Sequence, residues 1–146
     1  MNDIVVEQRI AAPPATVYAY LTDPKLWQRW QGVRAMLDPR VGGIFSILMG
    51  NGLNARGTFV ELVPDRRVVF TWGWVDREEI PPGSTTVEID LRPDGAETVI
   101  VLTHRSMPVA EVELHRLGWE HYLPRLATAA TGADPGEDRQ PSPALG

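Results

Sequence analysis

Apolar residues follow two different periods along the chain, and the first quarter contains both. Residues 4–10 alternate between apolar and polar side chains, which predicts a strand with one mostly apolar face. Two prolines follow, and Pro14 suits the first position of a helix that continues at helical spacing to Thr22. A second short helical piece is predicted from Pro24 through Trp30, where Gly32 ends it.

The middle of the chain returns to the alternating period in stretches separated by turns rich in glycine, proline and aspartate. The predicted strands are residues 35–38, 45–49, 55–63, 68–75, 87–91 and 98–104. Because the turns between them are short, consecutive strands are expected to pair as antiparallel hairpins. The stretch 4–10 has no sequence neighbour of this kind, so it must join the sheet by long-range pairing.

One long helix is predicted from about Val109 to Ala130. Its apolar residues fall on a single narrow stripe, made of Val112, Trp119, Leu123, Leu126 and Ala130. Pro124 should remove the hydrogen bond to the Glu120 carbonyl and bend the helix. The order of elements favours an α+β fold in which an antiparallel sheet of about seven strands curves around this terminal helix.

Length and composition set the number of domains. The chain has 146 residues, which fits one domain with a single sizeable core. Residues 132–146 are rich in proline and glycine and nearly free of bulky apolar side chains. Such a segment cannot bury enough surface to offset its ordering entropy. We therefore expect a domain spanning residues 1–131 and a disordered tail.

Charge and cysteine content exclude several classes of partner and chemistry. The formal net charge is −5, so no basic field attracts nucleic acid or an anionic membrane. The absence of cysteine excludes disulfides, thiolate metal sites and thiol catalysis. No secretion signal and no long apolar run appear, so we expect a cytoplasmic protein. No phosphate-binding loop is present, and neither a cofactor nor a metal is predicted.

Five stretches together resemble a known family. They are AAPPATVYAYLTDPKLWQRW, DPRVGGIFSILM, GTFVELVPDRRVVFTWGW, TTVEIDLRPDGAETVIVLTH and GWEHYLPRLA. In this order they are similar to the carboxyl-terminal domain of activators of the Hsp90 ATPase and to their short bacterial relatives, within the START-like (SRPBCC) helix-grip superfamily. The resemblance covers residues 4 to about 131. It implies a bacterial protein with a sheet that grips the terminal helix, a cavity between them that holds an apolar molecule in many relatives, and a link to the stress response. It implies no catalytic residues.

Tryptophan is the most abundant aromatic residue, with five against three each of phenylalanine and tyrosine. In the implied architecture Trp27, Trp30 and Trp74 lie near the mouth of the cavity and are the better candidates for ligand contact, whereas for Trp72 and Trp119 a role in the core is favoured over ligand contact. Met36 and two further methionines would add adaptable lining. The predicted ligand-binding residues are Trp27, Trp30, Met49, Phe59, Trp72, Trp74, His104, Met107, His115, Trp119 and Leu123.

The titratable residues leave alternatives open. His115 lies within the apolar stripe of the long helix and His121 on the opposite side, so one helix cannot bring both to one metal ion. His104 and His115 are either hydrogen-bonded core residues or polar groups that line the cavity. Glu61 is either solvated or an inward general base with a raised pKa, while Glu88 is expected to face water.

Three functions follow from these observations. The first is a non-catalytic module that binds an apolar or aromatic small molecule between sheet and helix, as a monomer or a homodimer. The second is an interaction protein that modulates an Hsp90-type chaperone. The third is a cyclase or dehydratase in which His104, His115 or Glu61 acts as acid or base.

Overall fold

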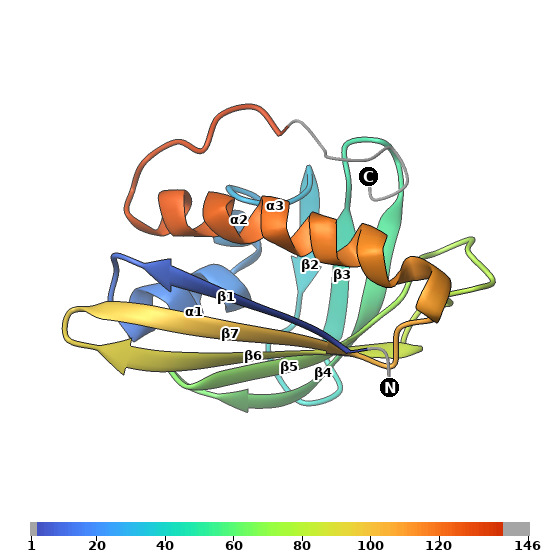
Figure 1. Cartoon of the computed structure of the whole chain (residues 1–146), viewed down its shortest axis with the longest axis horizontal. Helices are drawn as coiled ribbons and strands as arrows, with labels where there is room; N and C mark the ends of the chain where they lie inside the picture. Colours follow the sequence, from blue (N-terminus) through green and yellow to red (C-terminus); the bar gives the residue numbers. More distant parts are fainter. Residues whose placement is uncertain (1–2, 139–146) are drawn as a thin grey trace.

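A computed structural model of the chain describes residues 3–138, and these form a seven-stranded sheet and four helical segments (Figure 1). The strands are β1 (Ile4–Ile10), β2 (Arg34–Leu37), β3 (Ile44–Leu48), β4 (Asn54–Val63), β5 (Arg67–Trp72), β6 (Thr85–Asp94) and β7 (Glu97–Arg105). The helical segments are α1 (Pro14–Thr22), α2 (Pro24–Trp27), the 3-10 turn η1 (Val109–Glu111) and α3 (Val112–Ala130).

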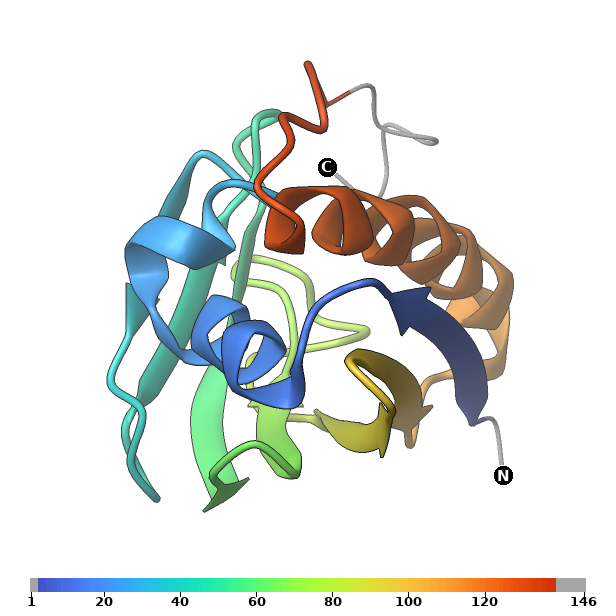
Figure 2. The same ribbon diagram turned by 90° about the vertical axis from the view of Figure 1, so that its left-hand side faces the viewer.

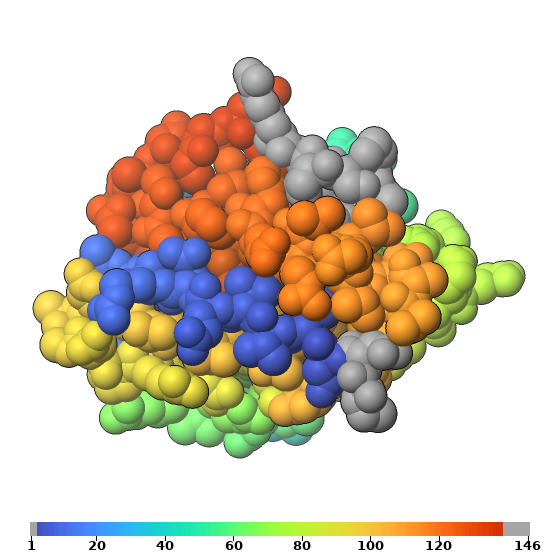
Figure 3. Space-filling view, viewed as in Figure 1, coloured from blue at the N-terminus to red at the C-terminus, as the bar shows by residue number. Residues whose placement is uncertain are grey.

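The sheet is antiparallel throughout and has the strand order β1-β7-β6-β5-β4-β3-β2. β1 reaches its place by pairing with β7, so that Ile4 lies opposite His104. Figure 2 shows how strongly the sheet curves: β1 and β2, its two edges, lie on opposite sides of the molecule with α3 above the concave face. β1 packs directly beneath α3 in the space-filling view (Figure 3). The predicted α+β helix-grip fold is confirmed.

The two short helices begin where the sequence places proline. Pro14 opens α1, and the Asp23 side chain caps α2 by accepting hydrogen bonds from the Lys25 and Leu26 amides at 2.8 and 3.3 Å. The prediction that α2 continues to Trp30 is wrong. The helix ends at Trp27, and the chain tightens into a turn in which the Trp30 amide donates to the Trp27 carbonyl at 3.1 Å.

Two strand predictions also need correction at their ends. β5 ends at Trp72, because Gly73 interrupts the ladder and Trp74 contributes only an isolated bridge to Ala55. β6 continues through Asp94, so the hairpin to β7 turns on residues 95–96 rather than on the preceding proline and aspartate. Gly95 has a φ of 61°, the left-handed conformation that tight hairpin turns require.

The terminal helix starts later than the sequence predicts. Residues 109–111 form the 3-10 turn η1, and α3 proper begins at Val112. Pro124 lies inside α3, which continues past it to Ala130. The buried side of α3 carries the predicted apolar residues Trp119, Leu123 and Leu126.

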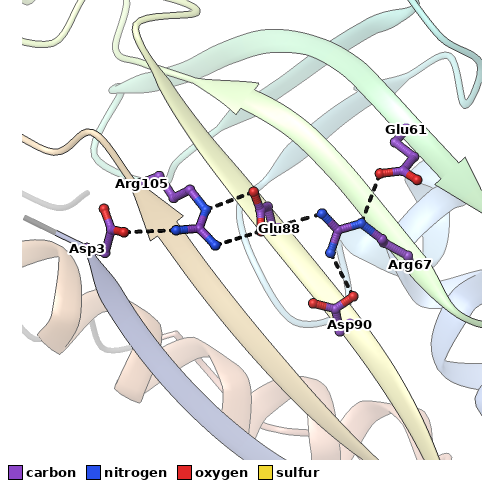
Figure 4. Close-up of polar contacts among 6 residues, drawn as sticks. All are labelled: Asp3, Glu61, Arg67, Glu88, Asp90 and Arg105. Atoms are coloured by element: carbon purple, nitrogen blue, oxygen red, sulfur yellow. Dashed lines mark hydrogen bonds and ion pairs between the residues drawn. The ribbon is translucent and has the colours of Figure 1, made fainter. Parts of the chain in front are cut away.

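The outer, convex face of the sheet carries a ladder of ion pairs rather than a second layer (Figure 4). Arg67 contacts Glu61 at 2.9 Å and Asp90 at 2.7 Å, and Arg105 contacts Glu88 at 2.8 Å. Hydrogen bonding to Arg105 lowers the pKa of the Glu88 carboxyl. Glu61 is exposed on this face, which excludes it as an inward general base.

The segment after α3 turns back over the helix. Asp138 accepts a hydrogen bond from the Tyr122 hydroxyl at 2.7 Å and pairs with the His121 ring at 2.7 Å. The Arg125 guanidinium donates to the carbonyls of Trp30, Pro135, Gly136 and Glu137. Residues 135–138 of the predicted disordered tail make these contacts, and residues 139–146 of that tail lie outside the described residues.

Across residues 3–138, no helix combines the length and the hydropathy needed to cross a bilayer.

Candidate functional site

A small pocket lies between the inner face of the sheet and α3. Its volume is about 20 Å³, which is room for about one water molecule. The residues that line it come from β5 and its following loop, α3, the turn after α2 and the end of β3. They are Gln31, Met49, Trp72, Trp74, His115, Gly118, Trp119 and Tyr122.

The pocket contains part of the predicted set. Met49, Trp72, Trp74, His115 and Trp119 line it. The other predicted residues are buried outside its lining: Trp27, Trp30, Phe59, His104, Met107 and Leu123. Met36 points the other way, with 44% of its surface exposed on the outer side of the sheet.

Sequence reasoning missed Gln31, Gly118 and Tyr122. Tyr122 lies one helical turn after Trp119, and this spacing could have identified it once the helix face was known. Gln31 and Gly118 carry no signal of this kind.

A glycine lets the two neighbouring tryptophans enter the pocket together. Trp72 and Trp74 point to the same side because they are two residues apart in an extended segment. Between them, Gly73 lies against the loop that follows: a Cβ atom on it would be only 1.8 Å from the Pro81 carbonyl oxygen. That close approach allows the Trp74 amide to donate to the Ile80 carbonyl at 2.7 Å. The loop therefore holds the backbone of Trp74, whose side chain lines the pocket.

His104 is held in one neutral tautomer by its neighbours. The Trp119 indole N–H can only donate, and it donates to His104 Nδ1 at 3.0 Å. The proton of the neutral ring therefore lies on Nε2, which donates to the Thr85 hydroxyl at 2.8 Å. Thr85 in turn donates to the Trp72 carbonyl at 2.7 Å. This chain of hydrogen bonds uses both ring nitrogens.

His115 is arranged in the same way with the nitrogens exchanged. The Trp74 indole N–H donates to His115 Nε2 at 2.9 Å, so the proton lies on Nδ1 and is donated to the Glu111 carbonyl at 2.9 Å. The rings of the two histidines meet edge to face with their centroids 5.8 Å apart.

Electrostatics keep both rings uncharged. Burial holds the pKa of His104 well below 6.5, and repulsion from His115 lowers it further. Burial also lowers the pKa of His115, although the hydrogen bond to the Glu111 carbonyl opposes this shift. Acid–base chemistry at either ring would first have to break a hydrogen bond with a buried tryptophan, which disfavours the enzyme hypothesis.

Trp72 differs from the other tryptophans in its hydrogen bonding. The indole N–H groups of Trp27 and Trp30 donate to Gln31 Oε1 at 3.1 Å and to the Tyr20 carbonyl at 3.3 Å. Those of Trp74 and Trp119 donate to the two histidines. The Trp72 N–H is buried and has no acceptor among the described residues, although the side chain lines the pocket.

No metal site accompanies the pocket: within residues 3–138, no three histidine, aspartate or glutamate side chains come close enough together to hold an ion. What the pocket offers is a set of aromatic walls, the neutral imidazole of His115 and the indole N–H of Trp72, a donor without an acceptor among the described residues.

Comparison with known proteins identifies the family. The model of the family described as activator of Hsp90 ATPase homolog 1-like protein matches residues 11–131. The chain belongs to this family. Among curated members, the human activator of 90 kDa heat shock protein ATPase homolog 1 is 28% identical over 120 residues. That match covers 82% of the chain but only 34% of the human protein, so the chain spans about a third of its relative.

Solved structures agree with this assignment. The solution structure of an AHSA1-like protein from Rhizobium etli is 44% identical, covers 93% of this chain and 87% of its own, and has a TM-score of 0.71. DynU16, from the dynemicin biosynthetic locus, has a TM-score of 0.80 over 94% of this chain and 51% of its own. Because DynU16 is only 22% identical, this likeness shows that the two chains have the same START-like fold and nothing further.

Proposed function

We propose that the chain is a non-catalytic binding module whose pocket takes a small aromatic molecule with one hydrogen-bond acceptor. The observation that carries this proposal is the indole N–H of Trp72, which has no acceptor in the described part of the chain although its side chain is only 2% exposed. A buried donor without an acceptor costs about 1–3 kcal/mol, and a ligand that supplies the acceptor recovers it. Native proteins keep few such groups, so this one calls for a partner that lies outside the described residues.

The pocket has to widen before an aromatic ring enters. Its present volume of about 20 Å³ is far below that of sites for larger organic ligands, which are about 300–1,000 Å³. Met49 is unbranched and can change rotamer without moving the backbone. Tyr122 is tied to Asp138, so the segment that contains Asp138 controls how far this wall can move. A lipid would need a much larger rearrangement, and a single-ring ligand is the better fit.

A pair of probes that differ only in the acceptor tests this function. Acetophenone has a carbonyl group where α-methylstyrene has a carbon–carbon double bond, and the two molecules are nearly the same shape. By calorimetry or ligand-observed NMR, the ketone should bind about tenfold more tightly, the value of one net hydrogen bond. Trp72→Phe should reduce the ketone's affinity to that of the alkene.

Trp30→Phe is the matched control, because this tryptophan is as buried as Trp72, lies outside the pocket and donates its indole N–H to the Tyr20 carbonyl rather than to a pocket residue. It should leave the ratio of ketone to alkene affinity unchanged. Failure of both probes to bind, or equal binding of both to the unaltered protein, would overturn the proposal.

A second candidate function rests on family membership. Activators of the Hsp90 ATPase are the relatives of residues 11–131. By this analogy we propose that the chain modulates the ATPase of an Hsp90-type chaperone, through contacts on its surface. A purified bacterial Hsp90-type chaperone should change its rate of ATP hydrolysis when the protein is added to saturation. An unchanged rate would rule out this function and would leave the pocket hypothesis intact.

A further inference from the structure

The outer face of the sheet has a groove at the end opposite the ion-pair ladder. It crosses β2, β3 and β4 and has a volume of about 230 Å³. The residues that line it are Arg34, Met36, Ser46, Leu48, Asn54 and Arg56. Strand register explains why they meet: Arg34 lies opposite Leu48 and then Asn54, and Met36 lies opposite Ser46 and then Arg56.

The two arginines of the groove have no acidic partner. Arg34 and Arg56 are exposed, and neither forms an ion pair or a side-chain hydrogen bond with any of residues 3–138. Other arginines do hold carboxylates: Arg9, Arg40, Arg67, Arg77, Arg105 and Arg116. In a chain of net charge −5, two neighbouring cations without carboxylates are unusual.

The remaining side chains of the groove add donors and apolar surface. The Ser46 hydroxyl donates to Asn54 Oδ1 at 3.0 Å, which leaves the Asn54 amide nitrogen without an acceptor among the described residues. Met36 is 44% exposed, and Leu48 is half-buried beside it. Protein interfaces are enriched in arginine and methionine, with an apolar centre and a polar rim, and the groove has this arrangement.

From this geometry we infer that the groove lined by Arg34, Met36, Ser46, Leu48, Asn54 and Arg56 docks an acidic, partly apolar segment of another protein. Its carboxylates would pair with Arg34 and Arg56 while its apolar side chains cover Met36 and Leu48. The segment lies on the face rather than extending the sheet, because the Ala35 amide on the open edge already donates to Gln28 Oε1 at 2.8 Å. Two arginines and an apolar centre suit a protein better than nucleic acid, which needs a longer row of cations.

A synthetic peptide provides the test. The probe is a rhodamine-labelled peptide of alternating glutamate and leucine, and its counterpart has lysine in place of glutamate. By fluorescence anisotropy the acidic peptide should bind and the basic one should not. Binding should weaken when NaCl is raised from about 0.05 to about 0.5 M. In the amide NMR spectrum, the signals that move should include Met36 and Leu48.

Charge reversal locates the contact. The double variant Arg34→Glu/Arg56→Glu should bind the acidic peptide at least about tenfold more weakly. Arg92→Glu is the matched control: Arg92 is also exposed on the outer face without a carboxylate partner among residues 3–138, but it lies on β6, away from the groove. It should change the affinity less than about twofold.

Three results would overturn this inference. They are equal weakening by the Arg92 control, equal binding of the basic peptide, and tighter binding of single-stranded DNA or phosphatidylserine vesicles than of the acidic peptide. Because the groove and the inner pocket lie on opposite faces of the sheet, none of these results bears on ligand binding at Trp72.

Discussion

The inner face of the sheet has two aromatic ends that look alike in composition but differ in hydrogen bonding. At the α2 end, Trp27 and Trp30 pack with centroids 4.6 Å apart, Phe45 stacks on Phe70 at 4.0 Å, and both indole N–H groups are satisfied. At the pocket end, the Trp72 N–H has no acceptor among residues 3–138. Both ends are buried, so burial alone does not distinguish a filled core from a binding site. What distinguishes the two ends is whether each buried N–H group has a hydrogen-bond acceptor.

Truncating a tryptophan side chain at the α2 end should give the largest loss of stability. Trp27 is fully buried and contacts Trp30, Phe45 and Phe70. Trp27→Ala removes these contacts and should lower the free energy of unfolding by about 3–5 kcal/mol. Urea denaturation followed by circular dichroism measures this. A loss below about 1 kcal/mol would mean that this end is loosely packed, and the contrast with the pocket would disappear.

Removing a histidine at the pocket end should also be costly, for a different reason. His104→Leu leaves the Trp119 indole N–H without its acceptor and should cost about 2–4 kcal/mol of unfolding free energy. His104→Leu/Trp119→Phe removes both partners and should be less destabilising than the two single changes added together. Simple additivity in urea denaturation would contradict the bond between these side chains.

The stability of the protein should fall as the pH decreases below about 6.5. The pKa of His104 in the folded state is far below its unfolded value of 6.5, and that of His115 is also lowered, so the unfolded chain binds more protons. The charged groups beside His115 are Glu111, which raises its pKa, and Arg77, which lowers it. Burial outweighs the effect of Glu111, so the pKa of His115 remains lowered, and the ring faces that of His104. Between about pH 7.5 and about pH 5.5, His104 should lower the free energy of unfolding by about 1 kcal/mol, and His115 should add a loss of the same sign.

The check is a series of urea midpoints across this range. His104→Leu should flatten the dependence on pH, because it removes the buried imidazole whose pKa lies well below 6.5. An unaltered slope in His104→Leu would show that other groups are responsible.

The smallest expected effect is the difference in stability between one Trp→Phe variant at each end of the inner face. Trp27→Phe leaves Gln31 Oε1 without its donor, while Trp72→Phe removes a donor that has no acceptor within residues 3–138. Both changes delete a similar volume, so Trp72→Phe should be the milder by about 1 kcal/mol. Equal losses in urea denaturation would mean that Trp72 has an acceptor in solution.

Sequence patterns could predict the elements but not the polar partners. The period-two stretches and Pro14 locate the strands and the first helix, because these signals are local. Met36 was expected in the cavity and lies on the outer face, because a strand of four residues carries too little alternation to fix which side points inward. The bond between Trp74 and His115 joins residues 41 apart, and only the tertiary fold brings them together.

The indole region of the NMR spectrum tests the central claim most directly. A ¹⁵N-tryptophan-labelled sample should give one Nε1–H signal for each of the five tryptophans. On titration with acetophenone we predict that the Trp72 signal moves downfield more than the other four, and that α-methylstyrene does not reproduce this shift. A Trp72 signal that stays in place while the ketone binds would contradict the assignment of this N–H as the donor in the pocket.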